Sequence, residues 1–214
     1  MWYWPEKARS AKYLPTFWVH DTESSHGRYA NHAKLITGID LVKFHGHACD
    51  GLFRGIYAMS QALKILFEDG IIDRTDLRFI SRNSPCLGDV GAYLTGGRVR
   101  FGTQDVLSRP GVWYIIQRIS SGVTVEVIEE EGFFPSEIVD KEAQLSNMTD
   151  GDEKAQLVTK LKSIQDQWVA NSLLTLTPRI IISQKKSSSI LGRYPMPIKD
   201  REQISSIKRF LSSR

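Results

Sequence analysis

Residues 44–52 read Phe-His-Gly-His-Ala-Cys-Asp-Gly-Leu, and apolar residues follow them at steps of three and four as far as Phe67. This spacing predicts an amphipathic helix with one face in a core, ended by Gly70. Asp50 is a suitable N-cap, because its carboxylate can accept a hydrogen bond from the first helical turn. The quoted stretch therefore lies at the start of a predicted helix, where free N–H groups favour negative charge.

Three side chains that bind metals occupy alternate positions in this stretch. In an extended backbone His45, His47 and Cys49 would point to the same side and place two imidazoles and a thiol around one point. Zn²⁺ and other borderline transition metals prefer imidazole nitrogen and thiolate sulfur, whereas Mg²⁺ and Ca²⁺ prefer oxygen. A thiol at a helix start also ionises more readily, which suits a metal ligand or a nucleophile.

The second of the chain's two cysteines, Cys86, has similar surroundings. A strand-like stretch at residues 77–80 precedes it, and a short helix that ends in glycine follows it. If the two helix starts meet, they gather a four-ligand set of His45, His47, Cys49 and Cys86. Asp89 would then lie close enough to orient a histidine or to serve as a base. A disulfide between the two cysteines is the minor alternative.

Both segments resemble the FmdE family, named after the FmdE component of formylmethanofuran dehydrogenase. Residues 47–52 are similar to the family's His-x-Cys-Pro-Gly signature, and residues 86–90 are similar to its Cys-x-x-Asp-Ala segment. The resemblance covers residues 40–130. The chain departs from the family at Asp50, where proline is usual, and at Gly97, where cysteine is usual.

The resemblance implies an α+β fold with a mixed or antiparallel sheet flanked by helices, a zinc-like ion near the His-x-Cys motif, and a homodimer. It does not transfer a reaction, because chemistry belongs to the site and not to the fold. The family's common C-terminal zinc ribbon is absent, since no Cys-x-x-Cys pair can be written with two cysteines.

Composition sets the outer bounds. With 214 residues, of which 41% are hydrophobic and 24% charged, the chain can bury a core of its own. Its apolar runs are shorter than the roughly 20 residues of a membrane span, and we expect a cytoplasmic protein, with an exported mature form as the alternative. The net charge is +4, but the basic residues are scattered, which argues against nucleic-acid binding.

Periodicity and turn residues predict the remaining organisation. We expect a metal-binding domain over residues 1–130, including an aromatic N-terminal lead-in, and a mainly helical extension over residues 131–214 packed on it. The predicted elements are a helix at 29–37, a hairpin of strands at 112–119 and 123–128, helices at 134–145, 152–174 and 200–211, and a strand at 179–183.

Three functions remain open. The first is an FmdE-like metalloprotein that binds or transforms a small-molecule ligand, with Asp89 and His45 as proton carriers and with Gly51 and Gly55 leaving space for the ligand. The second is a non-catalytic carrier or accessory subunit with a closed four-ligand site. The third is a metal-free thiol enzyme with Cys49 as nucleophile and a histidine as base. His45 has a further alternative role, a backbone hydrogen bond that holds its loop.

Overall fold

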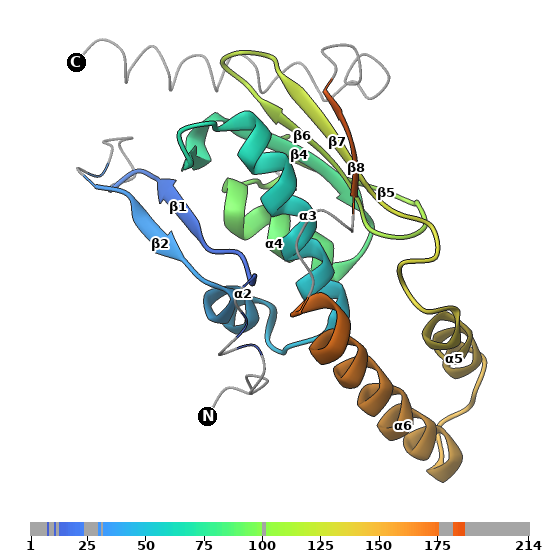
Figure 1. Cartoon of the computed structure of the whole chain (residues 1–214). Coiled ribbons are helices and arrows are strands. Elements are labelled where there is room, and N and C mark those ends of the chain that lie inside the picture. The colour runs from blue at the N-terminus through green and yellow to red at the C-terminus, as the bar shows by residue number, and fades with distance from the viewer. Residues whose placement is uncertain are drawn as a thin grey trace.

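Two sheets enclose a layer of helices in the computed structural model, which describes residues 8, 11, 13–23, 30, 32–99 and 102–175 and the strand at 182–186 (Figure 1). The larger sheet has five strands in the order β5-β4-β6-β7-β8, and the smaller has three in the order β2-β1-β3. The strands are β1 (Phe17–His20), β2 (Lys34–Ile36), β3 (Ile71–Asp73), β4 (Leu77–Arg82), β5 (Gln104–Leu107), β6 (Trp113–Arg118), β7 (Thr124–Glu129) and β8 (Ile182–Lys186).

The sheets are mixed. Strand β4 pairs with β5 in parallel and with β6 antiparallel, and β1 likewise has one parallel and one antiparallel neighbour. Strands β6 and β7 form the predicted hairpin, whose turn includes Gly122 in the left-handed region with φ of 69°. The predicted α+β class with a mixed sheet and flanking helices is confirmed.

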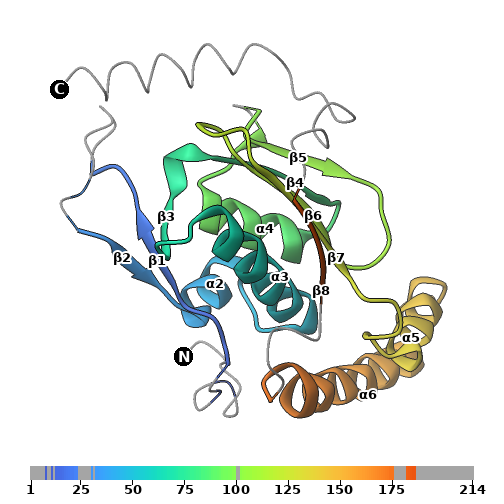
Figure 2. The ribbon, with the colours of Figure 1, turned by 45° about the horizontal axis from the view of Figure 1, so that its top comes forward.

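Helices α3 (Asp50–Leu66) and α4 (Pro85–Thr95) pack against one face of the larger sheet, and α2 (Gly38–His45) packs against both helices (Figure 2). Helices α5 (Ser136–Ser146) and α6 (Asp152–Trp168) form an antiparallel pair, and a π-helical turn at Val169–Leu173 continues α6. Both long C-terminal helices lie close to their predicted bounds. Among the described residues, no helix is long and apolar enough to cross a membrane.

Helix α3 is the centre of the core. It is buried on nearly all sides, and not on one face as the spacing predicts, because the larger sheet and the smaller sheet lie on opposite sides of the helical layer. Gly55 allows this packing, since a Cβ there would lie 3.0 Å from the Tyr114 hydroxyl and 3.1 Å from Leu87 Cδ2. The space beside Gly55 is thus filled by β6 and α4.

The helix predicted over residues 29–37 is wrong. Lys34–Ile36 form strand β2, and the helix begins only at Gly38. The physical reason is a capping arrangement, in which the Thr37 backbone N–H and hydroxyl donate to the Asp40 carboxylate at 2.8 and 2.7 Å. This interaction starts α2 after the strand.

The C-terminal part of the described chain packs on the same core. Val169, Leu173 and Leu174 belong to the hydrophobic cluster that contains α3. The domain boundary at residue 130 stays a prediction. The predicted strand at 179–183 corresponds to β8, which the structure describes from Ile182 onward. The predicted helix at 200–211 and the aromatic residues 1–7 lie outside the described residues.

Candidate metal centre

A tight turn between two helices carries the first ligands. His45 is the last residue of α2, and Gly46 follows it in the left-handed conformation with φ of 99°. The extended backbone assumed for the alternate spacing is therefore wrong. The N-cap of α3 is Cys49 and not Asp50, because the Leu52 N–H donates to Cys49 Sγ at 3.4 Å.

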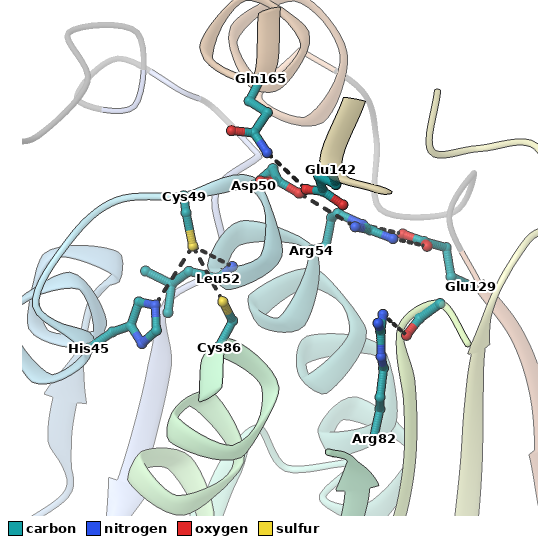
Figure 3. A network of polar contacts seen from close by, with 11 residues as sticks. His45, Cys49, Asp50, Leu52, Arg54, Arg82, Cys86, Glu129, Glu142 and Gln165 are labelled. Carbon is teal, nitrogen blue, oxygen red and sulfur yellow. Dashed lines mark hydrogen bonds and ion pairs between the residues drawn. The ribbon is translucent and has the colours of Figure 1, made fainter. Parts of the chain in front are cut away.

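The turn nevertheless brings the three side chains together. Ligand atoms of His45, His47 and Cys49 all lie within 4.8 Å of one another. His45 Nε2 is 3.7 Å from Cys49 Sγ (Figure 3), and the two imidazole centroids are 4.5 Å apart. His47 is exposed, whereas His45 and Cys49 are half-buried. The group therefore opens to solvent on the side of His47.

Helix α4 supplies the fourth candidate ligand. Cys86 is its second residue, after Pro85, and its Sγ lies 3.5 Å from Cys49 Sγ, with both cysteines free. Gly51 makes this approach feasible, because a Cβ there would lie 3.0 Å from Cys86 Sγ and 3.2 Å from Cys86 Cβ. The two helix starts thus meet, as the four-ligand set requires.

These distances fit a tetrahedral metal site. With bonds of about 2.3 Å from zinc to sulfur and 2.0–2.1 Å from zinc to nitrogen, tetrahedral geometry places two sulfurs about 3.8 Å apart and sulfur and nitrogen about 3.6 Å apart. The observed separations are 3.5 Å for Cys49 Sγ to Cys86 Sγ and 3.7 Å for Cys49 Sγ to His45 Nε2. Both edges agree with that geometry to within about 0.3 Å.

Asp89 supports His45 from one turn further along α4. Its Oδ2 lies 2.8 Å from His45 Nδ1, and the His45 side chain is 4% exposed while that of Asp89 is 38% exposed. A protonated Nδ1 that donates to this carboxylate leaves the lone pair of Nε2 directed toward Cys49. A carboxylate in this position fixes the tautomer and the ring orientation of a ligating histidine.

The two thiols share a proton. The hydrogen bond from Cys49 lowers the pKa of Cys86 to about 6, with further help from the nearby His45. The same hydrogen bond, with burial, raises the pKa of Cys49. Burial, reinforced by His45 and Lys162, lowers the pKa of His47. Cys49 is thus the protonated donor and Cys86 the thiolate acceptor, and a bound cation would take the place of that proton.

A second polar group beside the site was missed in the sequence. Arg54 lies one turn after Asp50 in α3, and its guanidinium makes two hydrogen bonds to the Glu129 carboxylate, one from Nε at 2.7 Å and one from Nη2 (Figure 3). Arg54 Nη1 lies 3.4 Å from Asp50 Oδ2, and the Phe134 ring centroid lies 3.7 Å from Arg54 Cζ. The four-residue spacing of Asp50 and Arg54 was the available signal.

Helix α6 also reaches the site. Lys162 Nζ lies 3.5 Å from the carbonyl oxygen of Ala48, between the two ligands His47 and Cys49, and forms an ion pair with Asp166. No motif linked this helix to the site, because the contact joins residues 114 positions apart. The C-terminal helices therefore form part of the surroundings of the candidate metal centre.

The FmdE family, described as "FmdE, Molybdenum formylmethanofuran dehydrogenase operon", matches residues 44–179. The match includes α5 and α6 and so extends past the motif-bearing region. Among solved structures, an FmdE-like protein of tungsten formylmethanofuran dehydrogenase from Syntrophus aciditrophicus is similar with a TM-score of 0.45 and 17% sequence identity, over 77% of this chain and 79% of that chain. No curated protein matches the sequence.

Proposed function

The chain belongs to the FmdE family, and we propose from this premise that it holds one zinc-like metal ion in a site that binds or transforms a small ligand. The ligands in this proposal are His45, His47, Cys49 and Cys86. The observation that carries it is the agreement of two inter-ligand distances with tetrahedral zinc geometry. The donors are nitrogen and sulfur, which favours zinc or a similar transition metal over Mg²⁺ or Ca²⁺.

Each residue of the site has a defined task in this proposal. Cys49 and Cys86 provide thiolates from two adjacent helix starts, whose N–H groups favour negative charge. Asp89 holds His45 in the tautomer that directs Nε2 toward Cys49. A bound zinc ion supplies a Lewis acid and lowers the pKa of a coordinated water. The roles of Asp89 and His45 as proton carriers stay predictions.

Ligand access is proposed on the side of His47. That imidazole is exposed, whereas the opposite side of the site is closed by α3 and α4. An exchangeable His47 would free one metal position for a small molecule, which is the arrangement of a catalytic site. Gly51 and Gly55 contact Cys86, Tyr114 and Leu87 in the structure, so their proposed contribution is to hold the helices close and not to contact the ligand directly.

A non-catalytic carrier or accessory role is the second candidate. It is favoured by the convergence of four protein donors, because a closed four-ligand site suits storage or structure, whereas three protein ligands and a water suit catalysis. Metal coordination separates the two candidates. The predicted homodimer and the small-molecule partner also stay proposals.

The test begins with metal content. We expect purified, reduced protein to contain about one zinc-like ion per chain by elemental analysis, and a strong chelator to remove it with little change in the circular dichroism spectrum or the melting temperature. The reason is that this chain buries a large core of its own, unlike small zinc domains that depend on the metal to fold. Unfolding on metal removal would instead identify a structural ion and contradict the ligand-binding proposal.

Replacing Asp89 tests the orientation of His45. We expect Asp89→Asn to lower zinc affinity about 10- to 100-fold, because the amide is a weaker acceptor for His45 Nδ1 and no longer fixes the tautomer. Competition with a chromogenic chelator measures the change. Asp105→Asn, on the exposed edge strand β5, is the matched control and should leave zinc affinity unchanged. Equal affinities for Asp89→Asn and the parent chain would remove Asp89 from the site.

A further inference from the structure

The two sulfurs of the candidate centre are close enough to react with each other. Cys49 Sγ and Cys86 Sγ are 3.5 Å apart, and both thiols are free. They are also the only two cysteines of the chain, so that one intramolecular disulfide is available and no competing pair exists. Both residues are half-buried, which leaves access for a small oxidant but restricts access for a large one.

The backbone also approaches closely enough for a bridge. Gly51, two residues after Cys49, lies so near α4 that its Cβ would be 3.2 Å from Cys86 Cβ. A disulfide needs a sulfur separation of about 2.0 Å and Cα atoms about 4.4–6.8 Å apart. Side-chain rotation about χ1 at the two helix starts can close the remaining sulfur separation without moving the helices apart.

We propose that Cys49 and Cys86 form a reversible disulfide when a hydroperoxide reaches the site, and that formation of this disulfide releases the metal ion. The inference rests on the proposed metal site and adds redox control to it. The two sulfurs are then at once the anionic ligands and the reacting atoms, so that oxidation and metal binding exclude each other.

The reaction balances with the hydroperoxide as oxidant. One thiolate attacks the distal oxygen of hydrogen peroxide, the O–O bond breaks, and the departing hydroxide takes a proton to give water and a sulfenic acid. The second thiolate attacks the sulfenic sulfur, the S–O bond breaks, and a second water leaves with another proton. The two cysteine sulfurs together lose two electrons, which reduce one peroxide to two waters.

Loss of the metal follows from the ligand count. A disulfide sulfur carries no negative charge and is a poor ligand, so oxidation removes both anionic donors and leaves only His45 and His47 of the proposed set. The second thiol within 3.5 Å also protects the first, because condensation to the disulfide competes with further oxidation to sulfinic acid. A reductant such as dithiothreitol then restores both thiols and the site.

The experiment uses the full chain, reduced, loaded with zinc and freed of reductant. Hydrogen peroxide is added in small excess, and three quantities are followed: released zinc with a chromogenic chelator, free thiols after denaturation, and intact mass. We expect release of the bound zinc, loss of both titratable thiols, and a mass lower by two hydrogen atoms, all reversed by dithiothreitol. Peptide mapping should join Cys49 to Cys86 within one chain.

Cys86→Ser is the matched control, since one thiol remains and no intramolecular bridge can form. Its mass should rise by oxygen atoms on cysteine and should not fall by two hydrogens. For the parent chain, retained zinc with two titratable thiols, oxygen added to Cys49 or Cys86, or disulfide-linked chains would each overturn the inference. Failure of the reduced chain to take up zinc would instead overturn the proposed metal site, and thiol counts on the same sample would still report the bridge.

Discussion

Cys49→Ser is expected to abolish stoichiometric zinc binding and to leave the fold intact. The serine hydroxyl can replace Cys49 Sγ as acceptor for the Leu52 N–H at the start of α3, because serine is among the best N-cap residues. It cannot replace the thiolate as a metal ligand, since a neutral hydroxyl is a weak donor to zinc. The substitution thus separates the two tasks that Cys49 performs in the structure.

The expected loss of affinity is large. Four-ligand zinc sites in small peptides contribute about 10–16 kcal/mol, so an equal share for one ligand is about 3 kcal/mol, or more than a hundredfold in affinity. Chelator competition on the parent chain, Cys49→Ser and Cys86→Ser measures it. Cys49→Ala should lose zinc equally but should also lose about 1 kcal/mol of unfolding free energy, because it removes the cap. Unchanged zinc affinity in Cys49→Ser would exclude this sulfur as a ligand.

The sequence was most informative where one element carried its own signals. Helix α3, the strand before α4 and the β6–β7 hairpin each have local periodicity and turn residues, and all of them form. The meeting of Cys49 with Cys86 followed from the resemblance and from two cysteines at two helix starts. The route to His45 differed, because Gly46 turns the chain between two helices instead of extending it.

Contacts between distant elements were not predictable in this way. The capping residues Thr37 and Asp40 lay in plain view, but the apolar run before them suggested a helix that began too early. Arg54 with Glu129 and Lys162 with Ala48 join residues whose separation in sequence carries no periodic signal. Their approach depends on how β7 and α6 pack on α3, which is a property of the whole fold.

The pairing of Arg54 with Glu129 carries the second large effect. The side chains of Arg54 and Glu129 are 8% and 6% exposed, and the Asp50 carboxylate beside them is also buried. Removal of the Arg54 guanidinium, which Figure 3 shows next to the site, would leave two buried carboxylates without it. Breaking a buried pair on one side costs more than the pair contributes, because an uncompensated charge remains in the interior.

We therefore expect Arg54→Met, which keeps the length and apolar bulk of the side chain, to lower the free energy of unfolding by about 3–5 kcal/mol in chemical denaturation. Lys141→Met is the control, since it breaks the exposed Lys141–Glu137 pair, for which about 0.5 kcal/mol or less is expected. Adding Glu129→Leu to Arg54→Met should recover much of the loss, because both charges are then gone and only the Asp50 carboxylate has lost its partner. If the double variant is less stable than Arg54→Met, the cost lies in lost packing against Phe134 and not in a buried charge.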